Sequence, residues 1–107
     1  MSYRIERVNE LIKEQLTELV HADFLDEIIS INFINTSADL SQAKIFFSVA
    51  SERESVYKAV ISNSWRYWKV MSKKIKIRRL PKLILLKDDM KADIERIEEL
   101  MEKKGAR

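Results

Sequence analysis

The chain of 107 residues has room for one domain, and nearly half of its residues are apolar, which is enough for a hydrophobic core. The absence of cysteine excludes disulfides, thiolate zinc sites and cysteine nucleophiles. No apolar run approaches the roughly 18 residues of a membrane span, and the first seven residues lack the apolar core of an export signal. The sequence therefore predicts a soluble cytoplasmic protein with no membrane partner.

The charges are unevenly distributed along the chain. Residues 55–87 include ten lysines and arginines and no acidic residue. The remaining residues hold ten cations and seventeen acids, a net charge of −7. Such an asymmetry within one domain attracts polyanions to one side of the molecule.

The first half of the sequence predicts a helix followed by a β-hairpin. Apolar residues recur at spacings of three and four over residues 3–21, which is typical of an amphipathic helix. Residues 27–34 and 43–50 alternate in the pattern of two half-buried strands, with Ile29, Ile31 and Phe33 on one face of the first. The polar stretch between these strands favours an antiparallel hairpin.

A long helix is predicted after the hairpin. Ser51 and Glu54 have the spacing of a capping box, in which the serine hydroxyl accepts from the Glu54 amide and the glutamate reaches back. The apolar period then continues for about 20 residues, until the approach to Pro81 ends it. Periodicity assigns four aromatic residues to the core: Phe46, Phe47, Tyr67 and Trp68.

The end of the chain predicts one more strand and one more helix. Residues 83–86 form a short apolar run that fits a buried strand in parallel pairing. Asp88 and Asp89 can cap a last helix over about residues 89–104, followed by a flexible tail at 105–107. We therefore expect a single α+β domain over residues 1–104, with a three-stranded sheet packed against helices.

No pattern of a catalytic or metal site is present in the sequence. Gly105 is the only glycine, which excludes phosphate-binding loops. His21 is the only histidine and falls at a predicted helix end, where a capping role is the simpler interpretation. Asp88 and Asp89 are better explained as helix caps than as magnesium ligands. We expect no catalytic residue, no metal and no cofactor.

The cations of the long helix fall on one side, opposite the apolar residues. At 100° per residue they form a basic stripe about five turns long. Its members are Lys58, Arg66, Lys69, Lys73 and Lys76, continued past the helix end by Arg78, Arg79 and Lys82. A solvated face usually mixes charges of both signs, whereas this stripe has no acidic partner. The pattern therefore favours nucleic-acid binding over a merely solvated face.

Trp65 falls among these cations. It can stack on an unpaired base, or it can pack on lysine stems or a neighbouring strand if the helix kinks and turns it inward. We favour packing.

Three segments, in sequence order, resemble those of the ribosome-binding factor A family, and the resemblance covers nearly the whole chain. They are Arg4-Ile5-Glu6-Arg7-Val8-Asn9-Glu10-Leu11-Ile12, Asp39-Leu40-Ser41-Gln42-Ala43-Lys44-Ile45-Phe46-Phe47-Ser48 and Ile75-Lys76-Ile77-Arg78-Arg79-Leu80-Pro81-Lys82-Leu83, the last followed by Asp88-Asp89.

The resemblance implies a KH-like fold of type II with the order α-β-β-α(-α)-β-α. In this family the two helices after the hairpin meet at a kink with an Ala-x-Gly motif. The motif falls here on Asn63-Ser64-Trp65, so both small residues are missing. The resemblance also implies RNA-facing positions at Arg7, Lys76, Arg78 and Lys82. Four further candidates, Arg66, Lys69, Lys73 and Arg79, depend on the charge pattern alone.

The family resemblance implies a function in ribosome biogenesis. We expect a non-catalytic assembly factor that binds the immature small ribosomal subunit and its precursor rRNA, supports processing of the rRNA 5′ end and growth in the cold, and is a monomer when free. Two alternatives stay open, a general single-stranded RNA-binding protein and a protein-interaction module for an acidic partner. An enzyme would need a metal-carboxylate scheme, for which the sequence has no clustered acids.

Overall fold

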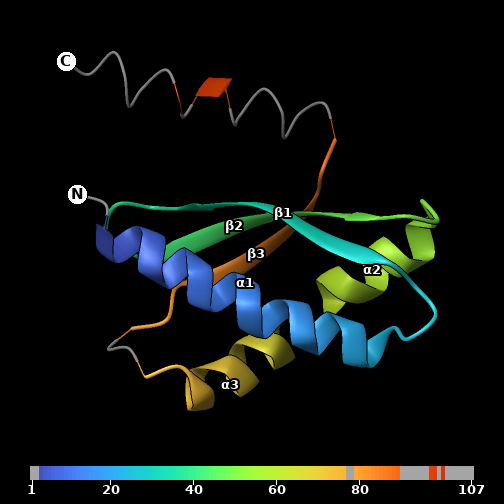
Figure 1. Ribbon diagram of the computed structural model, residues 1–107, viewed down its shortest axis with the longest axis horizontal. Helices are drawn as coiled ribbons and strands as arrows, with labels where there is room; N and C mark the ends of the chain where they lie inside the picture. The colour runs from blue at the N-terminus through green and yellow to red at the C-terminus, as the bar shows by residue number, and fades with distance from the viewer. Residues whose placement is uncertain (1–2, 77–78, 90–96, 99, 101–107) are drawn as a thin grey trace.

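The computed structural model describes residues 3–76, 79–89, 97, 98 and 100 (Figure 1). Its elements are α1 (Tyr3–Asp23), β1 (Ile29–Thr36), β2 (Gln42–Val49), α2 (Glu54–Ser62), α3 (Ser64–Lys74) and β3 (Lys82–Lys87). The predicted α+β class and the order of these elements are confirmed. The last predicted helix and the tail lie almost entirely outside the described residues.

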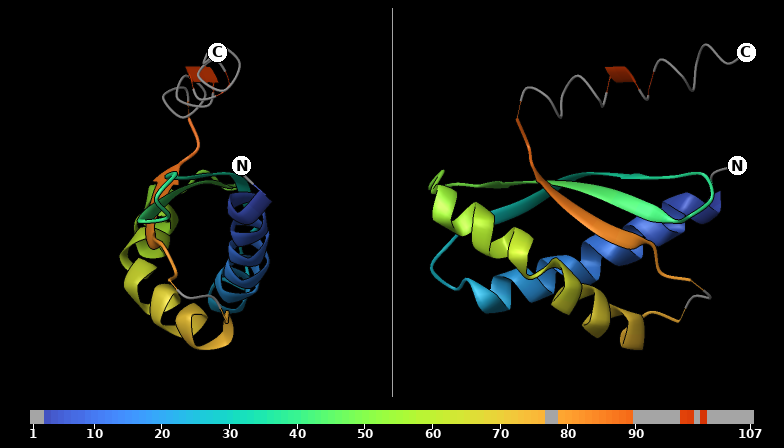
Figure 2. Two further views of the ribbon diagram at one scale, coloured as in Figure 1. Left: turned by 90° about the vertical axis from the view of Figure 1, so that its left-hand side faces the viewer. Right: turned by 180° about the vertical axis from the view of Figure 1, so that it is seen from behind.

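The sheet has three strands with β2 in the centre. β1 pairs with β2 antiparallel, and β3 pairs with β2 parallel, as predicted. Figures 1 and 2 show that α1, α2 and α3 all lie on the same side of the sheet. α2 and α3 together form the crossover that a parallel β2–β3 pair requires.

The hydrophobic core lies between the sheet and the three helices. α1 contributes a stripe of fully or almost fully buried side chains at intervals of four residues: Val8, Ile12, Leu16 and Val20. Tyr67 and Phe47 are buried in this core as predicted, and Trp68 packs against it while half-buried. The amphipathic period therefore located the core side of α1, α2 and α3 correctly.

A β-bulge in β1 reverses which side chains of the second half of the strand point toward the core. Ile31 pairs with Phe47 but Phe33 pairs with Phe46, so Asn32 is an extra residue. Beyond it, Phe33 stacks on Phe46 with ring centroids 5.7 Å apart. Phe46 is buried as predicted, but it does not belong to the core cluster under the helices. The expected placement of Phe33 beside Ile29 and Ile31 is therefore wrong.

The predicted capping box does not form. α2 begins at Glu54, and its N-cap residue, Arg53, makes no side-chain capping bond. The Ser51 hydroxyl instead donates to Glu27 Oε1 at 2.8 Å, and the Glu54 carboxylate accepts from Lys87 Nζ at 2.6 Å. The preceding Glu52 has a φ of 60°, in the left-handed region, which turns the chain between β2 and α2. The side chains of Ser51 and Glu54 therefore bond to residues of other elements and not to the helix N-terminus.

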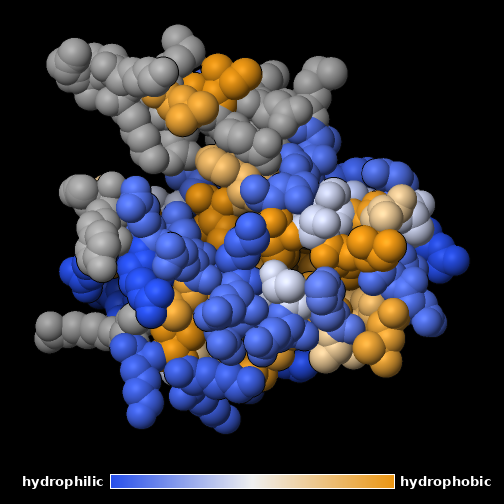
Figure 3. Space-filling model, in the orientation of Figure 1, coloured by the Kyte–Doolittle hydropathy of each residue, from blue (hydrophilic) through white to orange (hydrophobic). Residues whose placement is uncertain are grey.

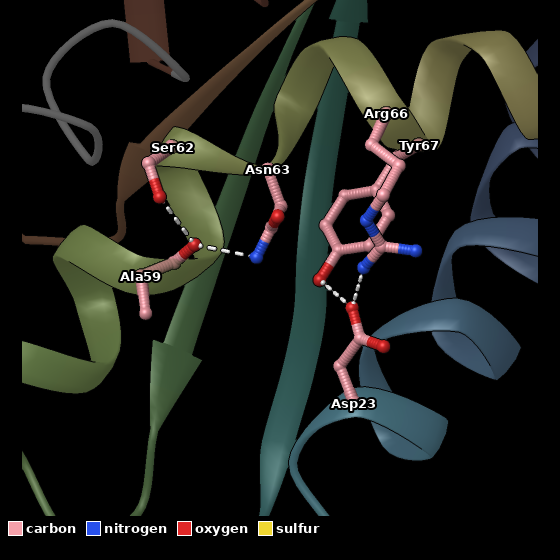
Figure 4. A network of polar contacts seen from close by, with 6 residues as sticks. All are labelled: Asp23, Ala59, Ser62, Asn63, Arg66 and Tyr67. Carbon is pink, nitrogen blue, oxygen red and sulfur yellow. Dashed lines mark hydrogen bonds and ion pairs between the residues drawn. The ribbon is translucent and has the colours of Figure 1, made fainter.

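The predicted single helix is two helices that meet at Asn63. The Asn63 Nδ2 and the Ser62 hydroxyl both donate to the carbonyl oxygen of Ala59, at 3.0 and 2.9 Å (Figure 4). Asn63 has φ −92° and ψ 5°, a conformation that needs no glycine. The break implied by the family resemblance is confirmed without the small residues, and the continuous helix is wrong.

Candidate nucleic-acid interface

Five of the exposed cations on α3, on the segment that leads into β3 and at the first residue of β3 form the candidate interface. They are Lys69, Lys73, Lys76, Arg79 and Lys82, hereafter the basic surface. None of them forms an ion pair with a carboxylate of the described residues. Figure 3 shows hydrophilic side chains over much of the face that α1 and α3 present. The basic surface therefore carries positive charge that phosphates can neutralise.

Spacing and packing bring three members of the basic surface, Lys69, Lys73 and Lys82, to neighbouring positions. Lys69 and Lys73 are one helical turn apart, so they project from the same side of α3. Lys82, at the start of β3, lines the same hollow as Trp65 and Trp68 of α3. The first residue of β3 and the outer side of α3 are thus neighbours. Arg78, the remaining predicted cation of this segment, lies outside the described residues.

Arg66 and Lys87, two cations of the acid-free segment, are paired with acids from other elements. The Arg66 guanidinium binds Asp23 Oδ2 at the end of α1 and lies over the Tyr67 ring, 5.0 Å from its centroid (Figure 4). Lys87 binds Glu54 at the start of α2. The expectation that the basic stripe lacks acidic partners is therefore wrong for Arg66, because its partner is distant in the sequence. Lys87 is not a member of the predicted stripe.

These contacts shift the pKa values of the groups involved. Burial, followed by the hydrogen bond that the Tyr67 hydroxyl donates to Asp23 Oδ2 at 2.8 Å, raises the pKa of Tyr67. The hydrogen bond from Lys87 lowers the pKa of Glu54, and the same bond raises the pKa of Lys87. All three shifts favour the protonation states in which the contacts exist.

The basic stripe is shorter than the five turns predicted from the sequence. The break at Asn63 places Lys58 on α2, where it interacts electrostatically with Glu54. Arg66 is occupied by Asp23. The members of the stripe that lack acidic partners are therefore confined, within the described residues, to α3 beyond Arg66 and to the segment up to Lys82.

Arg7 is exposed on α1, and its Nη1 donates to Glu10 Oε1 at 3.2 Å. An exposed ion pair of this kind contributes only about 0–1 kcal/mol, so Arg7 can exchange its partner for a phosphate. Arg4, one turn earlier, lines a hollow of about 520 Å³ together with Arg79. Sequence reasoning missed Arg4 because only the tertiary fold brings it beside Arg79.

Asp39 is the acidic residue that lines this Arg4–Arg79 hollow. Its carboxylate accepts hydrogen bonds from the hydroxyls of Ser41 and Ser37, at 2.7 and 2.8 Å, and from the Ser41 amide at 3.0 Å. These bonds, those of Ser41 first, lower its pKa to about 2. One oxygen of the carboxylate, Oδ1, is therefore occupied by hydrogen bonds within its own turn.

Trp65 remains outside the core, with 65% of its surface exposed. The expectation that a kink turns it inward is therefore wrong. Its ring stacks instead on Trp68, with centroids 5.1 Å apart and an interplanar angle of 5°. Trp68 is held in turn by its Nε1, which donates to the carbonyl oxygen of Leu80 at 3.3 Å. The two rings border a hollow of about 410 Å³ that the sequence alone did not indicate.

The described residues include no group of three or more histidine, cysteine, aspartate or glutamate side chains that could hold a metal ion. His21 Nε2 lies 3.2 Å from the carbonyl oxygen of Ile29, so it ties the end of α1 to β1 when that nitrogen carries the proton. Within the described residues, no helix is long and apolar enough to span a membrane.

These features define a small α+β domain, with the element order of a KH-like fold, whose basic surface flanks a tryptophan-lined hollow. The family model described as Ribosome-binding factor A matches residues 4–101. The chain therefore belongs to the ribosome-binding factor A family.

Individual relatives agree with this family. The chain is 34% identical over 106 residues to ribosome-binding factor A of Ruthia magnifica subsp. Calyptogena magnifica, and the match covers 95% of each chain. It is 31% identical over 103 residues to ribosome-binding factor A of Prochlorococcus marinus (strain MIT 9301), covering 86% of this chain and 76% of the relative. The crystal structure of ribosome-binding factor A from Thermus thermophilus has the same fold, with a TM-score of 0.63 at 22% identity over 74% of this chain and 89% of that one.

Proposed function

We propose that this protein is a non-catalytic ribosome assembly factor that binds the immature small ribosomal subunit through its rRNA and supports processing of the rRNA 5′ end. Membership of the ribosome-binding factor A family supports the ribosome as partner. The observation that supports RNA contact is the basic surface, whose exposed cations have no carboxylate partner among the described residues.

The proposed contacts are made chiefly to phosphates. Lysine and arginine side chains at the surface position RNA by its backbone and shape, and they carry little sequence information. The protein would then act sterically and conformationally: by occupying an immature RNA junction, it favours one fold of that junction until processing is finished. Arg7, Arg78 and the basic surface are the residues to which we assign these contacts.

Sedimentation of tagged protein through a gradient of cell lysate tests the partner. We expect the protein to migrate with small subunits and not with mature ribosomes. Nuclease treatment should release it, because the contacts are to RNA. A complex that survives nuclease would support the alternative of an acidic protein partner.

A salt titration tests the electrostatic basis of binding. If about five phosphates of single-stranded RNA are neutralised, the logarithm of the affinity should fall against the logarithm of salt concentration with a slope of about −3.5. A slope near zero would contradict the proposed contacts. Competition between small-subunit RNA and homopolymers separates a ribosomal factor from a general single-stranded RNA-binding protein, for which both would compete equally.

A further inference from the structure

The hollow beside Trp65 is unlike the rest of the basic surface, because its walls are mostly apolar. The two indoles, Leu80 and Leu83 form these walls, and Ser41, Ser64 and Lys82 contribute the polar groups. Its volume of about 410 Å³ lies in the range of small-molecule sites and is ample for one nucleobase. It opens beside the cations that would hold a phosphate backbone.

Trp65 is held in place without being buried. Its parallel stack on Trp68 fixes the ring, and Trp68 is anchored to the core and to Leu80. The Trp65 indole N–H nevertheless makes no hydrogen bond to any described residue, and 65% of the side chain is exposed. A large aromatic ring that is fixed, exposed and next to cations is the arrangement that proteins use to stack bases of single-stranded RNA.

The polar groups around the hollow can still form hydrogen bonds or an ion pair with a ligand. The Ser64 hydroxyl and Lys82 Nζ have no hydrogen-bond or ion-pair partner within the described part of the chain. The Ser41 hydroxyl donates to Asp39, so its remaining capacity is chiefly that of an acceptor. Among the described residues that line the hollow, Lys82 carries the only charge, and that charge suits a phosphate.

We propose that this hollow receives one unpaired base of the bound RNA, stacked against Trp65, with the phosphate of the same nucleotide at Lys82. The proposal rests on the proposed function, since it names the part of the RNA that this site takes. It adds an apolar, salt-insensitive contribution to the phosphate contacts of the basic surface. Because every base has an aromatic face, the contribution is tolerant of sequence.

Two polyanions distinguish base stacking from charge. A short oligouridylate presents unstacked bases and phosphates, and an inorganic polyphosphate of matching charge presents phosphates alone. We expect Trp65→Ala in the full chain to weaken oligouridylate binding by about 5- to 150-fold and to leave polyphosphate binding unchanged. Trp65→Phe keeps an aromatic face, so it should lose much less oligouridylate affinity than Trp65→Ala. Leu25→Ala is the control, because Leu25 is 85% exposed and does not line the hollow.

Tryptophan fluorescence gives a second measurement. Oligouridylate should quench the emission of the wild-type protein much more than that of Trp65→Phe, whose remaining tryptophan is Trp68. The double variant Lys82→Gln, Trp65→Ala should lose less binding free energy for oligouridylate than the sum of the losses of the two single variants, since both residues hold one nucleotide. Additive losses would overturn the assignment of Lys82 to that nucleotide.

The outcomes separate this site from the function on which it rests. The base site would be overturned if Trp65→Ala left oligouridylate affinity unchanged, or if it weakened polyphosphate binding equally. In either case, salt-dependent binding of RNA would still support the proposed function. Failure of the wild-type protein to bind either polyanion would contradict both.

Discussion

The Tyr67 hydroxyl donates a hydrogen bond of 2.8 Å to the carboxylate of Asp23, which is 44 residues earlier in the chain. The Tyr67 ring is fully buried, whereas Asp23 ends α1 at the surface. Arg66 binds the same carboxylate oxygen (Figure 4). The contact therefore fixes the start of α3 against the end of α1, and it helps to set the side of α3 from which Lys69 and Lys73 project.

Replacement of Tyr67 by phenylalanine should lower the free energy of unfolding by about 1–2 kcal/mol. A hydrogen bond to a charged group contributes about 1.5–3 kcal/mol, and the loss is smaller here because the Asp23 carboxylate can regain water. Urea denaturation measures the change. Arg66→Gln is the control, and it should cost less than about 1 kcal/mol because both members of the ion pair are partly exposed, Arg66 at 49% and Asp23 at 28%. Equal losses in the two variants would show that the phenol makes no special contribution.

Local patterns in the sequence predicted most of the elements. The apolar period of residues 3–21 is strong because one side of α1 is buried along its whole length, from Val8 to Val20. The hairpin and the parallel β3 followed from alternation and from the need for a crossover. These signals lie within single elements, and for that reason one sequence is enough to detect them.

The errors have a common physical origin in contacts between elements. Asn32 forms a bulge, and its side chain donates to Ser48 on β2 and to Asp88 just beyond β3, at 3.1 and 2.6 Å. Arg66 finds its acid on α1, and Ser51 turns from the predicted cap to Glu27. The hollow beside Trp65 gathers residues from the approach to β2, from α3, and from β3 and its approach. None of these partners is close in the sequence.

Asp39 should contribute to stability in a defined range of pH. Its pKa is lowered from 3.8 to about 2, so the folded state is favoured above the ordinary pKa of the group. This contribution is lost as the pH falls from about 4 to about 2. Asp39→Asn should therefore reduce the acid sensitivity of unfolding in that range, and a carbon-detected NMR titration should find the carboxyl of Asp39 ionised at about pH 3. Asp26→Asn, at an exposed loop aspartate, is the control.

The junction at Asn63 tests whether the helix break needs a small residue. Asn63→Ala removes the side-chain bond to Ala59 and should cost about 0.5–1.5 kcal/mol. Asn63→Gly loses the same bond and also about 0.5–1 kcal/mol of backbone entropy, because the φ of −92° does not favour glycine. The temperature of thermal unfolding should therefore be highest for the wild-type protein, lower for Asn63→Ala and lowest for Asn63→Gly. A glycine variant more stable than the alanine variant would contradict this ranking.

Charge reversal on the basic surface should weaken RNA binding without changing the fold. Lys69→Glu combined with Lys73→Glu alters two exposed side chains that have no ion-pair partner among the described residues, so the free energy of unfolding should change little. The salt dependence of RNA affinity should decrease by about 0.7 units of slope for each lysine that contacts a phosphate. Filter binding over a series of salt concentrations measures both affinity and slope.

The matched control for this variant is Lys13→Glu combined with Lys58→Glu, which changes the net charge equally and breaks no ion pair of the described residues, but lies on α1 and α2. Long-range attraction depends on the total charge, whereas phosphate contacts depend on position. If both double variants weaken binding to the same degree, the effect is one of net charge and the basic surface is not the binding site. If the control alone weakens binding, the RNA lies on the face of α1 and α2 instead.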